Sequence, residues 1–320
     1  MDYRNLGRTG LKVSPLCMGA MQFGWTADEE TSFAILNAAL EAGINFIDTA
    51  NVYSRWVVGH EGGESETILG RWMKKFDIRR DRVVIASKVF SRMGDGPNDG
   101  GLSRAHIMNA IDDSLGRLGT DYLDLYQTHA FDPATPIEET LSALDDLVKA
   151  GKVRYLGCSN YPAWRLMQAL WASDRLGLCR FECLQPHYNL VHRQEFESEL
   201  AAVCEAYYIG VIPYSPLAAG FLTGKYRRDT DLPESARRAG VRHRYLNEKG
   251  WAVLEALEGV SKNYGEASIS QAALAWLMVN PLVTSPIIGP RSLEQLSDNL
   301  AALDIRLSGE DVAILESVSR

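Results

Sequence analysis

The sequence lacks the cysteine patterns of metal centres and of disulfide-stapled folds. Its five cysteines are scattered, odd in number and never arranged as a CxxC pair. Zinc sites and small secreted domains need closely spaced or evenly paired cysteines. We therefore expect reduced, buried thiols and no metal; the cysteines are Cys17, Cys158, Cys179, Cys183 and Cys204.

Long apolar runs and an excess of positive charge are also missing. The longest apolar stretch, residues 271–289, is interrupted by Asn280-Pro281 and Ser285-Pro286, so it cannot form one membrane-spanning helix. The first residues carry charge where a secretory signal has an apolar core. The formal net charge of −8 disfavours a general nucleic-acid surface but allows one local phosphate pocket. These absences predict a soluble cytoplasmic protein with a small-molecule partner, and they leave its oligomeric state open.

The chain has neither a linker rich in Pro, Gly or Ser nor a GxGxxG turn. Without a linker, nothing divides the 320 residues, so we expect a single domain over 1–320. Without the glycine fingerprint, the doubly wound dinucleotide fold has no support. Residues 220–226 look like a phosphate loop, but the glycines are too close together and Tyr226 stands where Ser or Thr is required.

Eight short apolar runs rich in β-branched residues recur along the chain and predict eight strands. Stretches with helical spacing, such as 107–118 and 137–148, lie between most of them. Apolar strands that alternate with helices are typical of a parallel sheet, and eight such units favour a closed (β/α)8 TIM barrel over an open sheet. The runs are 13–18, 44–48, 83–88, 122–127, 153–157, 181–185, 211–214 and 284–288.

Residues at the expected helix ends agree with this alternation. Gly43 and Gly151 follow helical stretches, as residues that end helices do. Asp28, Ser103 and Ser292 precede helical stretches and are suited to capping their first turns. The expected helices therefore begin and end at residue types that favour helix starts and helix ends.

Two segments fall outside the alternation. Residues 3–13 predict a β-hairpin that plugs the lower end of the barrel. Residues 217–247 show no clear period and are locally basic, which predicts a long loop after the seventh strand. We expect this loop to close over the phosphates of a bound cofactor as a flap; a solvated surface insertion is the alternative.

Four residues stand at the ends of the expected strands or in the loop that follows: Asp48, with Tyr53 in the loop after it, Lys88 and His129. Alone, the aspartate would be a helix cap, the lysine a surface side chain and the histidine a core residue. Together, Lys88 would stabilise the phenolate of Tyr53 and lower its pKa, while Asp48 would hold the ammonium in place. His129 would donate a hydrogen bond to a substrate oxygen. The set would supply the proton that carbonyl reduction needs.

From end to end, the chain resembles the aldo-keto reductase family. The resemblance implies the barrel, a nicotinamide cofactor and a catalytic group of Asp48, Tyr53, Lys88 and His129. The segments that carry the resemblance are 6–14, 48–50 with Tyr53, 65–66 with 69–70, 87–88, 121–125 with His129, 157–160, Gln185 with 188–189, 214–217, and Gly289 with Arg291 and 294–295.

The resemblance also implies a cofactor-binding set. Ser159, Asn160 and Gln185 would hold the nicotinamide carboxamide, and Tyr214 would stack on the ring. An arginine at a helix start suits a 2′-phosphate, so NADPH/NADP⁺ is expected; a surface arginine beside a turn is the alternative. The remaining implied residues are Ala20 and Met21, then Ser215, Leu217 and Lys225 along the pyrophosphate, and Gly289, Arg291, Gln295 and Asn299 at the adenosine end.

Residues 54–63 depart from the usual family pattern, which has a shorter glycine-rich turn. They lie at the expected mouth of the site, so Trp56 would line the substrate pocket or else be an exposed loop aromatic. Two other functions compete with carbonyl reduction: a cofactor-binding redox sensor with little turnover, and a barrel isomerase with a phosphate site in its last loops. The sequence gives neither the carbonyl substrate nor the physiological direction.

Overall fold

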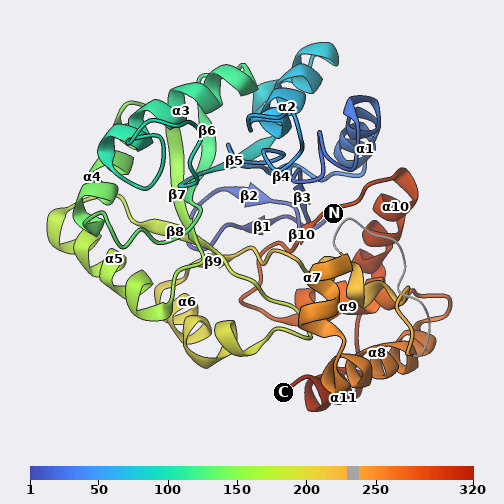
Figure 1. Ribbon diagram of the computed structural model, residues 1–320. Helices are drawn as coiled ribbons and strands as arrows, with labels where there is room; N and C mark the ends of the chain where they lie inside the picture. Colours follow the sequence, from blue (N-terminus) through green and yellow to red (C-terminus); the bar gives the residue numbers. More distant parts are fainter. Residues whose placement is uncertain (229–237) are drawn as a thin grey trace.

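Eight parallel strands form the central sheet of the protein. The computed structural model describes residues 1–228 and 238–320 (Figure 1). The strand order is β10-β3-β4-β5-β6-β7-β8-β9. The strands are β3 (Cys17–Gly19), β4 (Phe46–Asp48), β5 (Val84–Val89), β6 (Leu123–Thr128), β7 (Val153–Ser159), β8 (Phe181–Gln185), β9 (Gly210–Val211) and β10 (Ile287–Ile288).

The segment that enters β10 closes this sheet. The N–H of Thr284 donates to the carbonyl of Val211 at 2.8 Å, and the N–H of Ile287 donates to the carbonyl of Pro213 at 2.9 Å. On its other side β10 pairs with β3 in parallel. The predicted (β/α)8 barrel is therefore confirmed.

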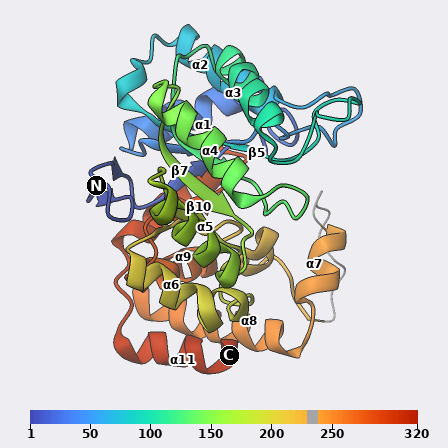
Figure 2. The ribbon, with the colours of Figure 1, turned by 90° about the vertical axis from the view of Figure 1, so that its left-hand side faces the viewer.

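Helices surround the barrel, as Figures 1 and 2 show. Asp28, Ser103 and Ser292 cap the helices that follow them, each accepting a backbone N–H as predicted. No helix in the described ranges is both long enough and apolar enough to span a bilayer. The helices are α1 (Glu29–Glu41), α2 (Glu64–Lys75), α3 (Arg104–Leu118), α4 (Ile137–Lys149), α5 (Ala163–Leu176), α6 (Ala201–Tyr207), α7 (Arg238–Tyr245), α8 (Glu248–Ser261), α9 (Ile269–Val279), α10 (Leu293–Ala301) and α11 (Gly309–Ser319).

The N-terminal hairpin lies across one end of the barrel, as predicted. Strand β1 (Arg4–Asn5) pairs antiparallel with β2 (Lys12–Val13), and Leu6 is fully buried among side chains that point into the barrel from several strands. Gly7 meets the first residue of β9 so closely that a Cβ on Gly7 would lie 2.6 Å from the nitrogen of Gly210. The hairpin therefore packs at the N-terminal ends of the strands and leaves the opposite rim for a site.

Two expectations about secondary structure are wrong in part. The run 13–18 is not one strand: Val13 ends β2 and Cys17 begins β3, because Pro15 between them has no N–H to donate to a ladder. The segment 217–247 is not a plain loop, since it contains a 3-10 turn (Ala218–Thr223) and helix α7. Helix α7 buries Val241 and Tyr245, an apolar pair too short to show a period. The part of the flap prediction that falls on residues 229–237 lies outside the described residues.

Candidate active site

Asp48, Tyr53 and Lys88 form a buried hydrogen-bonded group at the C-terminal ends of β4 and β5. The ammonium of Lys88 donates to Oδ1 of Asp48 at 2.5 Å, to the hydroxyl oxygen of Tyr53 at 2.8 Å and to the carbonyl of Thr49 at 2.8 Å. Lys88 is fully buried and Asp48 is 1% exposed. All three ammonium protons are therefore used, and two of them fix the lysine between a carboxylate and a phenol.

Burial and neighbouring charge set the protonation states of this group. Burial lowers the pKa of Lys88, but the adjacent Asp48 and Tyr53 outweigh it and the pKa rises above its ordinary value. For Tyr53, burial raises the pKa, and the opposing charge of Lys88 only partly offsets this rise. The expectation that Lys88 brings this pKa below its ordinary value is wrong, because desolvation is the larger effect. At neutral pH the site holds an ammonium and a neutral phenol, which can donate a proton.

His129 directly follows β6 and faces Tyr53. The two ring centroids lie 5.9 Å apart with an interplanar angle of 75°. Burial, with a smaller contribution from the charge of Lys88, lowers the pKa of His129 to about 3. Its Nδ1 is buried without a hydrogen-bond partner among the described residues. The imidazole is therefore neutral at physiological pH and retains hydrogen-bonding capacity beside the phenol.

Two glutamine amides complete the surroundings of Asp48. Gln185 Nε2 donates to Oδ2 of Asp48 at 2.8 Å, and Gln127 Nε2 donates to the same oxygen at 3.0 Å. Gln127 was not predicted from the sequence. The available signal was a polar side chain at a buried position of β6, in register with Lys88 on β5.

The residues that the family resemblance assigns to the nicotinamide lie together next to His129. Ser159 Oγ donates to the backbone carbonyl of Gln185 at 2.8 Å, and Asn160 Nδ2 donates to the carbonyl of His129 at 2.9 Å. The hydroxyl of Tyr214 donates to Oδ1 of Asn160 at 3.0 Å. The ends of β7 and β8 and the segment after β9 thus contribute to one polar cluster.

The other implied cofactor residues lie on three further segments. At the start of α10, the N–H of Arg291 donates to Oε1 of Gln295 at 2.9 Å, and Arg291 is exposed. The N–H of Ala20 donates to the carbonyl of Asp48 at 2.8 Å, which places the end of β3 beside the acidic residue. The segments are Ala20 and Met21 after β3, Ser215, Leu217 and Lys225 after β9, and Gly289, Arg291, Gln295 and Asn299 around α10.

Trp56, in the extended turn after β4, contacts this group from the outside. Its ring is edge-on to Tyr53, with centroids 6.2 Å apart, and edge-on to Trp25, with centroids 5.5 Å apart. Trp56 is 47% exposed. Trp25 was not predicted, although its position shortly after β3 would have indicated the same rim. The structure thus places Trp56 beside the phenol, with Trp25 packed against Trp56.

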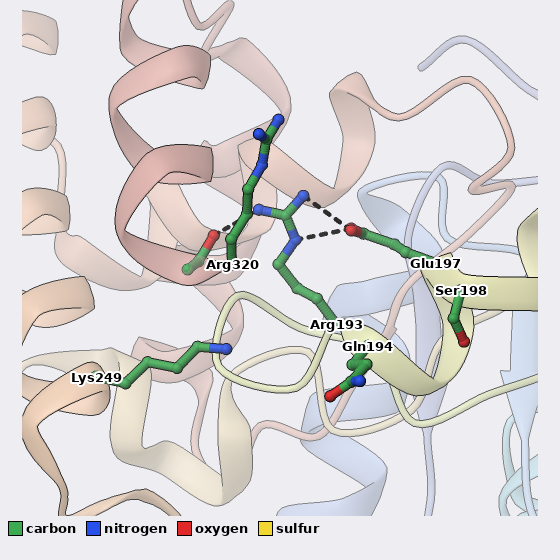
Figure 3. A pocket seen from close by; sticks show the side chains of 7 residues that line it. Arg193, Gln194, Glu197, Ser198, Lys249 and Arg320 are labelled. Carbon is green, nitrogen blue, oxygen red and sulfur yellow. Dashed lines mark hydrogen bonds and ion pairs between the residues drawn. The ribbon is translucent and has the colours of Figure 1, made fainter.

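A separate hollow shares no residue with this group (Figure 3). In it, Arg193 donates to both carboxylate oxygens of Glu197, at 2.8 and 2.9 Å, and to Oγ of Ser319 at 2.6 Å. The carboxylate of Glu197 neutralises the charge of Arg193. The hydrogen bond from Arg193 to Ser319 connects the segment after β8 to α11. The hollow is lined by Arg193, Gln194, Glu197, Ser198, Lys249, Ser319 and Arg320. Because this hollow contains none of Asp48, Tyr53, Lys88 and His129, we place the candidate active site at the C-terminal rim of the barrel, where those residues lie.

Comparison with known proteins shows the family to which the chain belongs. A family model described as "Aldo/keto reductase family" matches residues 15–320. The uncharacterized oxidoreductase YrpG of Bacillus subtilis is 40% identical over 99% of this chain and 96% of its own length. Versiconal hemiacetal acetate reductase of Aspergillus parasiticus is 34% identical over 99% and 96% of the two chains. An Oryza sativa protein named "Probable voltage-gated potassium channel subunit beta" is 37% identical over the same shares. The chain belongs to the aldo/keto reductase family.

Proposed function

We propose that this protein is an NADPH-dependent reductase of aldehydes or ketones that also oxidises alcohols in the reverse direction. Its family and the relatives named as oxidoreductases or reductases support carbonyl reduction. The observation that carries the proposal is the hydrogen bond from Lys88 to the phenol of Tyr53, with Asp48 behind the lysine. We infer that it acts as one domain over residues 1–320, in the cytoplasm.

The donor set at the rim fits a nicotinamide nucleotide. Ser159, Asn160 and Gln185 offer the hydroxyl and amide groups that a carboxamide needs, and Tyr214 offers a flat surface for a ring. The side chain of Arg291 has no hydrogen bond or ion pair with the described residues and lies at the N-terminus of α10, which suits a phosphate. When bound, the nicotinamide supplies the hydride.

Residues of the protein then transfer a proton to the substrate oxygen. Tyr53 donates its phenolic proton to the oxygen that becomes an alkoxide, and Lys88 stabilises the phenolate left behind. Asp48 keeps the ammonium in place. His129, neutral because of its burial, hydrogen-bonds the carbonyl oxygen and aligns it. In the reverse direction, the phenolate of Tyr53 accepts the proton of an alcohol.

Trp56 and Trp25 form the wall of the proposed substrate pocket. Trp25 contacts Trp56 edge-on, and Trp56 in turn contacts Tyr53 edge-on. A bound carbonyl compound would therefore meet aromatic surface on this side. Such a wall favours flat or apolar substituents next to the carbonyl group. Replacing Trp56 by Ala should therefore raise KM more for aromatic aldehydes than for small aliphatic ones.

Helix α7 supports the proposed nicotinamide platform. The hydroxyl of Tyr245 lies 3.1 Å from Nε2 of His187, and the ring of His187 stacks on Tyr214 with centroids 5.0 Å apart. We infer that α7 becomes more ordered when the cofactor binds and so slows its release. Hydrogen exchange of α7 with and without NADPH tests this: unchanged protection would leave a surface insertion as the better interpretation.

A redox sensor on the same fold is the alternative function. The 37% identity to the Oryza sativa protein named as a channel subunit favours it. One assay separates the two functions: NADPH absorbance followed against a panel of aldehydes, ketones, quinones and sugars. Turnover supports the reductase, whereas bound NADPH without turnover of any compound supports the sensor.

A further inference from the structure

The second oxygen of the Asp48 carboxylate is held by an amide pair. Gln127 and Gln185 both donate to Oδ2, and Gln185 Nε2 also lies 3.3 Å from Oε1 of Gln127. Gln127 is fully buried and Gln185 is 2% exposed. The side-chain carbonyl of Gln127 faces Gln185, while that of Gln185 has no hydrogen bond to the described residues. The pair therefore connects Asp48 to the cluster of Ser159 and Asn160.

The strand register creates the space for this contact. Gln127 on β6 pairs with Lys88 on β5 and with Gly157 on β7. A Cβ on Gly157 would lie 3.1 Å from Cγ of Gln127 and 3.1 Å from the carbonyl oxygen of Cys183. Gly157 is thus the neighbour that lets the Gln127 side chain reach across the barrel to Asp48.

We propose that Gln127 is a positioning residue that orients the Asp48 carboxylate so that Oδ1 serves Lys88 alone. This inference rests on the proposed function. Without Gln127, Oδ2 would keep only the donor of Gln185. The carboxylate would then be freer to turn toward the ammonium with both oxygens, and its charge would be less well solvated. The shared amide contact also makes Gln185 respond to both Asp48 and a bound carboxamide, so cofactor position and proton donor are physically linked.

The expected effect is electrostatic. The N–H of Gln127 takes up part of the negative charge of Asp48, and removing it lets that charge act more strongly on Tyr53. The phenolate then forms less readily, so alcohol oxidation needs a higher pH. Because Gln127 acts on Tyr53 only through Asp48, loss of its hydrogen bond to the carboxylate predicts a roughly three- to tenfold slower hydride transfer at neutral pH.

The test is the pH profile of single-turnover alcohol oxidation with saturating NADP⁺. Gln127→Met keeps the volume and removes the donor; the profile should move to higher pH, with NADP⁺ affinity nearly unchanged. Thr128→Val is the matched control, because it removes a buried hydroxyl from the next residue of β6 without touching Asp48, and its profile should equal that of the wild type. An unshifted Gln127→Met profile would overturn the inference, even if the rate fell through altered packing.

A second variant keeps the inference testable if Gln127→Met folds poorly. Gly157→Ala leaves the glutamine in place but presses on its Cγ, and it should shift the profile in the same direction by less. In the double variant the two shifts should not add, because both act through one contact. Wild-type turnover reports on the proposed function separately: an active wild type with unshifted variants contradicts only the role of Gln127.

Discussion

Lys88 donates a hydrogen bond of 2.8 Å to the hydroxyl oxygen of Tyr53, although the two residues are 35 positions apart in the chain. The lysine lies near the end of β5 and the tyrosine follows the neighbouring strand β4, so the barrel rim brings them together. The contact places a permanent positive charge beside a neutral phenol in a buried setting. Such a phenol can lose its proton only because that charge is present.

Replacing Lys88 by Met should therefore lower kcat for carbonyl reduction by about two orders of magnitude or more. The phenol loses the positive charge that opposes burial, while burial continues to raise its pKa. Asp48 is also left buried without its cation, which should reduce the free energy of unfolding by about 3 kcal/mol. Single-turnover kinetics at a temperature where the variant is folded measures the effect, with Lys74→Met on the outer face of α2 as control. Near-normal kcat in Lys88→Met would remove the lysine from the mechanism.

The pH dependence of reduction should show no transition near pH 6.5. Burial lowers the pKa of His129 to about 3 in the folded protein, so its ring stays neutral across the physiological range. In the unfolded chain a histidine binds its proton near pH 6.5, so the free energy of unfolding should fall as the pH drops below about 6.5 toward 3. The kcat/KM of reduction, measured from about pH 5 to 8, checks the first statement. An inflection between about pH 6 and 7 that disappears in His129→Asn would contradict it.

Arg291→Ala should weaken NADPH binding roughly ten- to a hundredfold and NADH binding little. The exposed guanidinium at the start of α10 is placed to form charge-assisted hydrogen bonds with a 2′-phosphate, each worth about 1.5–3 kcal/mol. Fluorescence titration with both cofactors measures the difference, and NADH serves as the internal control. Equal weakening of both would assign Arg291 to the fold or to the pyrophosphate.

The contact between α2 and α3 gives a prediction about stability. A Cβ on Gly70 would lie 2.4 Å from the carbonyl oxygen of Arg117, so Gly70→Ala should lower the free energy of unfolding by about 1–3 kcal/mol. Gly116 on α3 is the matched control, since nothing lies within 4 Å of its added Cβ. Gly116→Ala should be neutral or stabilise by up to about 1 kcal/mol. Denaturant unfolding of both variants distinguishes a steric contact from a general effect of glycine replacement.

The barrel was predictable from the sequence because its signals are local. Apolar runs, helical spacing and caps such as Ser103 depend on residues only a few positions apart, and the structure has them as expected. The two misplacements have physical causes. Pro15 divides an apolar run between the hairpin and β3, and α7 is held by the buried side chains of Val241 and Tyr245, whose packing is tertiary.

The site was predictable only where chemistry coincides with strand ends. Asp48, Lys88 and His129 stand out because polar residues terminate apolar runs. Gln127 does not stand out, because its partner is 79 positions away and its role depends on the register of three strands. The direction of the Tyr53 pKa was also beyond the sequence, since it depends on how far burial outweighs the charge of Lys88.

The most direct test of the account is single-turnover NADPH oxidation by Tyr53→Phe, with NADPH affinity measured on the same preparation. Phenylalanine keeps the ring against Trp56 and His129 and removes the hydroxyl group, and with it the proton that Tyr53 donates and the oxygen that Lys88 contacts. We predict a rate at least about two orders of magnitude below that of the wild type, with NADPH binding nearly unchanged. A near-normal rate in Tyr53→Phe would contradict the assignment of Tyr53 as the general acid.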